Sequence, residues 1–189
     1  MFTSGGMQGP VVWLNGNPVT IVGRGRFLAV LYHDADPLVD GTQKLGYILY
    51  DAIACCEISS GSVSALSSGS LLTWAGFSND FSLSIMDSEG FLSLLFPLGH
   101  DSARIPSNWG WIPMLDTTKR KKSPNDTFWP IHIQDGKLNC IPLKGDTQYP
   151  NAARRPITSS LNLRIPLAHA LTENRYQIFF YCCFLILVV

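Results

Sequence analysis

A pattern of apolar runs separated by short turns occurs three times along this chain, and it constrains the fold more than any other feature. The first set covers residues 18–58, the second covers residues 71–115, and the third begins at residue 127. Each set is about 40 to 45 residues long, the size of one four-stranded blade of a β-propeller. A single blade leaves both faces of its sheet uncovered, so blades are stable only when they stack. The pattern therefore predicts an all-β partial β-propeller of about three four-stranded antiparallel blades.

The first two sets each predict an antiparallel sheet. We expect their strands at residues 18–22, 27–32, 44–50 and 55–58, and at residues 71–77, 81–87, 91–96 and 109–115. A Gly-containing turn at residues 23–26 predicts a hairpin between the first two strands. In the segment 81–87, Phe81, Leu83 and Ile85 alternate with two serines and a methionine. This period of two predicts a strand with one more polar face.

The third set is shorter than the others. Residues 127–134 and 137–142 predict two strands joined by a turn at Asp135 and Gly136. Residues 154–166 also alternate between apolar and polar side chains, and they supply one further strand.

The segments after the propeller pattern differ from it in composition. We expect a domain at residues 1–166, a short helical or irregular segment at residues 167–177, and an apolar tail of uncertain origin at residues 178–189. The tail is shorter than the roughly 20 residues of a membrane-spanning helix, so association with a membrane is the unfavoured alternative. A truncated or mis-spliced gene is the simpler source of such a tail. The first residues, a turn with no strand in front, likewise indicate a domain entered in its middle.

Composition narrows the classes of function. A hydrophobic content of 46% excludes a disordered chain, and 16 Gly with 12 Pro suit short strands and tight turns. Lys plus Arg and Asp plus Glu each number 14, so no overall basic field is present to hold a phosphate backbone. Contact with DNA is therefore expected to be weak or indirect.

The five cysteines lack the spacing of a metal or redox site. They occur as Cys55-Cys56, Cys140 and Cys182-Cys183, without the two-residue gap of zinc and disulfide-exchange motifs. The odd count and the adjacent pairs predict a reducing compartment, in which the cysteines are small apolar fillers. We predict no metal and no cofactor.

The loop after the second strand is the strongest candidate for metal or catalytic chemistry. His33, Asp34, Asp36 and Asp40 lie close together in sequence, and such groups can bind a hard cation or transfer protons. Their spacing does not match the calcium loop, whose ligands alternate up to a bidentate Glu. We interpret the segment as a solvated loop and keep a propeller-type hydrolase or lyase as the alternative. That alternative requires His33, Asp36 and Asp40 to converge at the channel mouth.

Four consecutive cations, Lys119, Arg120, Lys121 and Lys122, lie in the polar loop before the third set. Such a run can act as a nuclear-import signal or contact phosphates, although most charge runs are only solvated. A phosphate on Ser123, which precedes a proline, would offset this charge. We treat the run as a candidate nuclear-import or electrostatic patch.

Four tryptophans, Trp74, Trp109, Trp111 and Trp129, occupy similar strand positions in successive sets. Exposed indoles are platforms on which a nucleic acid or a peptide can stack. Propeller blades also use aromatic residues to pack one sheet on another. We favour core packing, which predicts that Trp129→Ala costs about 3 to 5 kcal/mol of stability.

Several strings of the sequence are characteristic in combination. The clearest are WAGFS at residues 74–78, MDSEGF at residues 86–91 and NWGWIP at residues 108–113. Others are FTSGG at residues 2–6, GPVV at residues 9–12, LAVLYH at residues 28–33, FW at residues 128–129, LNCIPLKG at residues 138–145 and RP at residues 155–156. Together they resemble the second β-propeller of the replisome adaptor family, which includes the WD-repeat and HMG-box DNA-binding protein, minichromosome loss protein, chromosome transmission fidelity factor and SepB.

This resemblance implies a nuclear, non-enzymatic scaffold of DNA replication, with no catalytic residue. Members of the family link the replicative helicase to the priming polymerase and to chromatin factors, and they trimerise through this propeller region. Full-length relatives also carry WD repeats, a helical region that captures short partner peptides and, in animals, an HMG box. This chain resembles only the propeller, so we expect its partners to be replisome proteins, with a homotrimer in the full-length parent.

Overall fold

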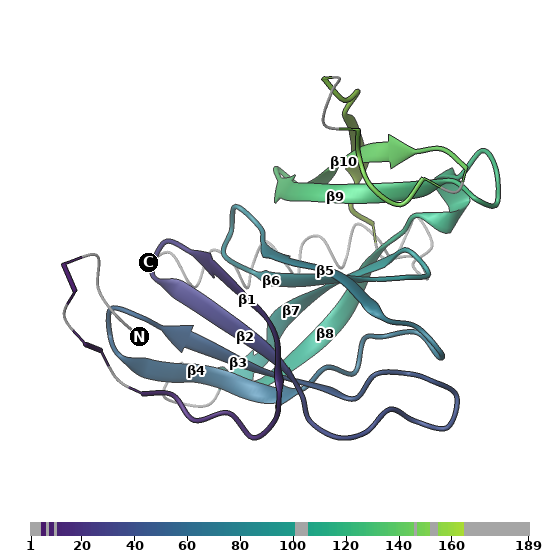
Figure 1. Ribbon diagram of the computed structural model, residues 1–189. Coiled ribbons are helices and arrows are strands. Elements are labelled where there is room, and N and C mark those ends of the chain that lie inside the picture. Colours follow the sequence, from purple (N-terminus) through teal and green to yellow (C-terminus); the bar gives the residue numbers. More distant parts are fainter. Residues whose placement is uncertain are drawn as a thin grey trace.

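Three antiparallel β-sheets make up the described part of the chain (Figure 1). The computed structural model describes residues 5–6, 8–9, 11–100, 106–145, 147–151 and 155–164. Two sheets have four strands and one has three, and each is built from strands that are consecutive in sequence. This arrangement confirms the predicted all-β partial propeller, and the described sheets do not close into a ring.

The first sheet has its strands in the order β1-β2-β3-β4. They are β1 (Pro18–Arg24), β2 (Phe27–His33), β3 (Leu45–Asp51) and β4 (Cys56–Ser62). The β1–β2 hairpin turns at Gly25 and Arg26 alone, because Arg24 already pairs with Phe27. Gly25 has a φ of 58°, and a positive φ at the first central residue is typical of type II′ turns, whose twist suits two-residue hairpins.

The second sheet has its strands in the order β5-β6-β7-β8. They are β5 (Leu72–Phe77), β6 (Leu83–Asp87), β7 (Phe91–His100) and β8 (Pro106–Asp116). The strand predicted at residues 81–87 begins later than expected, at Leu83. Phe81 instead has a φ of 61° and its N–H donates to the carbonyl oxygen of Ser78, so it lies in the β5–β6 turn.

The third sheet has the order β11-β10-β9. Its strands are β9 (Thr127–Gln134), β10 (Lys137–Leu143) and β11 (Ser159–Asn162), and the short 3-10 helix η1 (Thr118–Arg120) precedes them. Asp135 and Gly136 form the β9–β10 turn with φ values of 50° and 67°, as in a type I′ turn. β11 lies inside the segment predicted to add a strand, so this sheet has the three strands predicted from these segments, one fewer than a complete four-stranded blade.

Two hydrophobic clusters hold the sheets together, one on each side of the second sheet. The first contains Ala29, Leu31, Leu45, Tyr47, Leu49, Val63, Phe77, Leu83, Ile85 and Leu95, and the second contains Met86, Leu92, Leu94, Phe96, Leu115, Ile133, Leu138 and Cys140. Neighbouring residues of β6 therefore serve different clusters. The sequence predicted a more polar face for this strand. That prediction is wrong, because all residues of the strand are buried, Ser84 included. A serine here faces protein on the far side of the sheet instead of water.

The first strands of the three sheets, β1, β5 and β9, lie next to one another. A parallel bridge joins Ser78, just after β5, to Ile133 in β9. Beside it, the N–H of Asn79 donates to the carbonyl oxygen of Ile133 over 3.1 Å, and the Asn79 side chain contacts Asp135. Sheets that repeat radially around a common axis are the defining arrangement of a propeller.

Some predictions fall on residues that the structure does not describe. These are the helical or irregular segment at residues 167–177 and the apolar tail at residues 178–189. The domain boundary at residue 166 also stays a prediction. Within the described ranges, no helix has the length and apolar character needed to cross a membrane.

Candidate functional site

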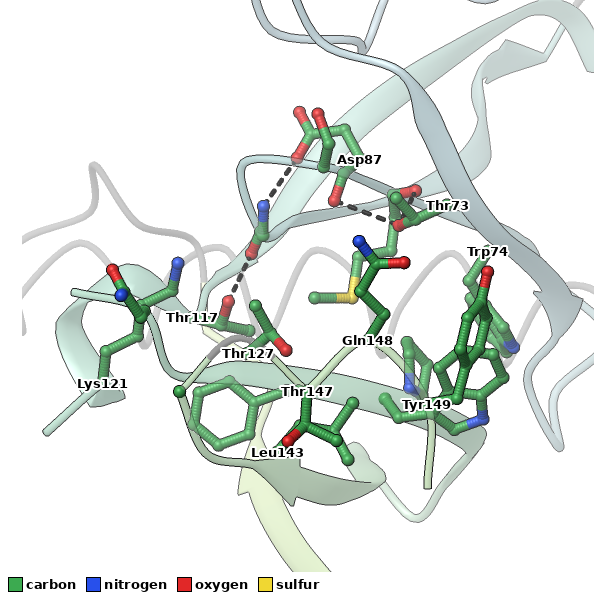
Figure 2. A pocket seen from close by; sticks show the side chains of 18 residues that line it. Thr73, Trp74, Asp87, Thr117, Lys121, Thr127, Leu143, Thr147, Gln148 and Tyr149 are labelled. Atoms are coloured by element: carbon green, nitrogen blue, oxygen red, sulfur yellow. Dashed lines mark hydrogen bonds between the residues drawn. The ribbon is translucent and has the colours of Figure 1, made fainter. Parts of the chain in front are cut away.

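A cleft of about 580 Å³ opens between the second and third sheets (Figure 2). One wall comes from the start of β5, the β6–β7 turn and the residues after β8. The other wall comes from the start of β9, the end of β10 and the loop that follows β10. The sequence contains no motif for this cleft, because it is formed by segments that meet only when two blades stack.

The cleft results from the divergence of β5 and β9. The parallel bridge between Ser78 and Ile133 holds the two strands together at one end. At the other end Thr73 and Thr127, near the starts of the two strands, line the cleft from opposite sides. Because sheets are twisted, two stacked sheets that touch at one point can diverge away from it, and the cleft lies toward the starts of β5 and β9, away from the bridge.

Aromatic side chains gather at one end of this cleft. The rings of Trp129 and Tyr149 meet nearly edge to face, with centroids 5.6 Å apart. Trp129 is 39% exposed and Tyr149 is 67% exposed. Trp74 lines the opposite wall and packs against the second cluster (Figure 2). This end of the cleft therefore presents accessible aromatic surface.

The four tryptophans do not share one position, which corrects the prediction from the sequence. Trp74 and Trp129 lie on the first strands of their sheets, whereas Trp109 and Trp111 lie on the fourth strand β8. Trp109 and Trp111 pack against the first cluster, as predicted. For Trp129 the prediction of core packing is wrong, because 39% of this residue stays exposed in the cleft, whereas the neighbouring Phe128 packs against the second cluster.

The carboxylate of Asp87 forms a buried part of the cleft wall and is only 2% exposed. Its Oδ2 accepts hydrogen bonds from the N–H and hydroxyl of Ser67, at 3.1 and 2.6 Å, and from the hydroxyl of Ser70 at 3.5 Å. Its Oδ1 accepts from the N–H groups of Gly90 and Phe91 at 2.9 and 2.8 Å. Asp87 thus fixes the β6–β7 turn to the segment before β5, and its oxygens are already engaged.

The basic run reaches the other end of the cleft. Lys119 and Arg120 end η1, and the Nζ of Lys119 lies 3.6 Å from the Oδ2 of Asp116. Lys121 lines the cleft, away from Trp74 and Tyr149 (Figure 2). Among the described residues, no ion pair is recorded for Arg120, Lys121 or Lys122. A role of the run in nuclear import stays a prediction.

The loop between β2 and β3, which carries the candidate acidic residues, is attached to the rest of the fold through Asp40. The hydroxyl of Ser68 donates to its Oδ2 over 2.5 Å, and the N–H of Thr42 donates to its Oδ1 over 3.0 Å. These hydrogen bonds, chiefly that from Ser68, lower the pKa of Asp40 to about 2. Across the described ranges, no three His, Cys, Asp or Glu residues are grouped so that they could hold a metal ion, and His33 and Asp36 join Asp40 in no such group.

The cysteines divide into two kinds. Cys140 is fully buried in the second cluster, and burial raises the pKa of its thiol to about 11, so its prediction as an apolar filler is confirmed. The same prediction is wrong for Cys55 and Cys56, which are exposed where β4 begins. The adjacent pair near the C-terminus lies outside the described residues.

Comparison with known proteins decides the family of this stack of sheets. The family model described as the middle region of the minichromosome loss protein Mcl1 matches residues 1–167. The chain belongs to the Mcl1 middle-region family. The match includes all three described sheets, and it confirms the predicted resemblance to the replisome adaptor family.

Relatives of this chain occur in plants, animals and fungi. Over 170 residues the chain is 35% identical to Protein ENHANCER OF LHP1 1 of Arabidopsis thaliana, covering 89% of this chain and 17% of that protein. Over 178 residues it is 32% identical to human WD repeat and HMG-box DNA-binding protein 1, covering 92% of this chain and 15% of that protein. Over 129 residues it is 34% identical to Minichromosome loss protein 1 of Schizosaccharomyces pombe, covering 67% of this chain and 15% of that protein. The chain thus spans 15 to 17% of the length of these relatives.

Proposed function

We propose that this member of the Mcl1 middle-region family is a non-enzymatic part of an adaptor in DNA replication, and that it acts by binding other proteins. Membership of the family carries the proposal, together with relatives named as a DNA-binding WD-repeat protein and a minichromosome loss protein. The equal numbers of basic and acidic residues favour proteins over DNA as the primary partners. A stack of sheets with two cores provides a rigid body on which such surfaces can be held in place.

In finer detail, we propose that the full-length parent works in the nucleus and links the replicative helicase to the priming polymerase. We also propose that the parent forms a homotrimer through its propeller region. Both proposals extend the resemblance found in the sequence.

Affinity purification of a tagged full-length relative tests the adaptor role. We expect a version that lacks the segment equivalent to residues 1–167 to lose the helicase and the priming polymerase from its co-purifying proteins, and to lose its trimeric mass in light scattering. A deletion of equal length outside this segment is the control. Undiminished recovery of both partners without the segment would contradict the proposal.

The basic run provides a separate test of nuclear location. In a fusion of the chain to a reporter too large to diffuse through nuclear pores, we expect changing Lys119, Arg120, Lys121 and Lys122 to Ala to abolish nuclear accumulation. Changing Lys137 and Lys144, which lie outside the run, is the matched control. Unchanged accumulation after the first set of changes would eliminate this role.

A further inference from the structure

The cleft between the second and third sheets has a shape and a lining that suit a short peptide. We propose that it binds an extended segment of a partner protein in which an aromatic anchor is followed by acidic residues. The inference rests on the proposed function, because it assumes that the domain acts through protein contacts.

The dimensions of the cleft favour a peptide over a folded domain. Its volume of about 580 Å³ lies within the range of roughly 300 to 1,000 Å³ that is typical of sites for small ligands. The lining residues of β5 and β9 lie near the starts of these strands, away from the bridge between Ser78 and Ile133, so an occupant enters from the side of Thr73 and Thr127. The site has room for a few side chains.

The aromatic end of the cleft is suited to an anchoring side chain. Trp and Tyr are enriched among the residues that dominate binding energy at protein interfaces. Trp129 and Tyr149 are already held against each other, so little side-chain entropy is lost when a third ring packs on them. Trp74 on the opposite wall would enclose that ring.

The edge of β9 favours recognition through side chains. β9 is an edge strand of the described third sheet and borders the cleft, where an added peptide strand could pair with it. Pro130 interrupts this edge because it has no N–H to donate. A continuous ladder of backbone hydrogen bonds cannot form there, so specificity depends on the anchor and on charge.

The charge of the cleft selects acidic residues after the anchor. Lys121 lies at the end of the cleft opposite Trp74 and Tyr149 (Figure 2). Lys121 belongs to the run of four cations at residues 119–122, and among the described residues only Lys119 of this run lies within ion-pair distance of a carboxylate, that of Asp116. The carboxylates of Asp87, Asp116 and Asp126 keep their charge when they accept hydrogen bonds from neutral groups, and the four cations outnumber them. An acidic peptide would complement this excess of positive charge.

Single-stranded nucleic acid also stacks on aromatic rings, but the cleft suits it less well. Proteins that bind single strands line their grooves with several cations that follow the backbone. Lys121 is the sole Lys or Arg among the described residues that line this cleft, so a phosphate backbone would find no row of cations to follow. We therefore commit to a peptide and make nucleic acid an outcome of the test.

The test measures binding of defined probes to the purified full chain by fluorescence anisotropy. The principal probe is a labelled peptide with one Phe followed by a run of Asp. The control probes replace Phe by Ser, replace Asp by Lys, or consist of oligothymidine. We expect the principal probe to bind at least about tenfold more tightly than each control, because both anchor and charge are required.

Variants of the chain assign the binding to the cleft. We expect Trp129→Ala and Tyr149→Ala each to weaken binding about tenfold, and Lys121→Glu to weaken it about three- to tenfold, with a smaller loss at high salt. Trp13→Ala and Lys137→Glu are matched controls, because Trp13 and Lys137 are exposed outside the cleft, and they should leave affinity unchanged. Circular dichroism verifies that each variant is folded, and Tyr149 is exposed enough for its loss to leave the fold intact.

Three results would overturn the proposal: no binding of the principal peptide, equal binding of the Lys peptide, or tighter binding of oligothymidine. Each can occur while the tagged full-length relative still recovers its replication partners. In that case the adaptor role survives and the cleft loses its assigned ligand. Conversely, peptide binding in the cleft without recovery of those partners would reject only the proposed replication role.

Discussion

At the scale of single residues, Gly90 is held in place by both its backbone and its surroundings. Its φ is 96°, a region that side chains with a Cβ rarely adopt, and an added Cβ would lie 2.3 Å from the Oγ1 of Thr117. Thr117 cannot move away freely, because it is buried and its hydroxyl donates to the carbonyl oxygen of Gly90 over 2.9 Å. The β6–β7 turn therefore requires glycine at this position.

Substitution of Gly90 should reveal both effects. We expect Gly90→Ala to lower the free energy of unfolding by about 2 to 4 kcal/mol, as judged by urea denaturation. Gly136→Ala is the matched control, because Gly136 also has a positive φ but a Cβ there would meet nothing within 4 Å. The control should cost about 1 kcal/mol. Equal losses in the two variants would show that the contact with Thr117 is unimportant.

Trp129 illustrates how exposure changes an energetic expectation. Since 39% of this residue remains exposed, we now expect Trp129→Ala to cost about 1 to 2 kcal/mol, less than the 3 to 5 kcal/mol expected for a core position. Leu138→Ala, at a fully buried position of the same sheet, should cost about 3 kcal/mol or more. Urea denaturation measures both, and a larger loss for Trp129→Ala than for Leu138→Ala would contradict the exposed position of the ring.

At the scale of strands and turns, local chemistry made much of the fold predictable. The turn at Asp135 and Gly136 was predicted because both residue types tolerate the left-handed backbone that type I′ turns need. Phe81 was misplaced because an aromatic residue in an alternating pattern normally indicates a strand. In the structure its ring packs on Phe27 of the first sheet, with the two ring centroids 5.4 Å apart. This tertiary contact overrides the local preference for a strand.

The loop between β2 and β3 should make stability depend on pH. Asp40 has a pKa of about 2 in the folded chain, below the ordinary 3.8, so its ionised form stabilises the fold above about pH 4. This contribution should be lost as the pH falls from about 4 to about 2. Urea denaturation at a series of pH values should show Asp40→Asn less stable than the parent above pH 4, with the difference shrinking as the pH falls through this window.

The partner of Asp40 offers a check on the cause of this dependence. Because the Ser68 hydroxyl is the main reason for the lowered pKa, Ser68→Ala should reduce the same pH-dependent difference. If Ser68→Ala had the same pH profile as the parent, the hydrogen bond would not be responsible.

At the scale of the whole molecule, we expect the protection of backbone amides from hydrogen exchange to follow the burial of each strand. The strands β3 and β6 are buried along their whole length, whereas β1 and β11 have no buried residue. We therefore expect backbone amides of β3 and β6 to exchange with solvent most slowly, and those of β1 and β11 fastest, in hydrogen exchange measured by mass spectrometry. Uniform protection over the described strands would contradict this order.

The repeated pattern predicted the number of sheets and the order of their strands, because each unit is local in sequence. It could not predict the cleft, since the lining residues come from two units and their separation depends on how the blades diverge. Lys121 was singled out for its charge, and Trp129 for its aromatic ring. Only the stacking of the second and third sheets shows that these two residues line one cavity.

The position of β6 between two cores has a consequence for the evolution of the sequence. Ile85 packs with the first cluster and its neighbour Met86 packs with the second. A change of volume at Ile85 should be compensated by substitutions in β2 or β3, and one at Met86 by substitutions in β9 or β10. Adjacent codons of one short strand therefore drift under separate constraints, each coupled to a different distant part of the gene.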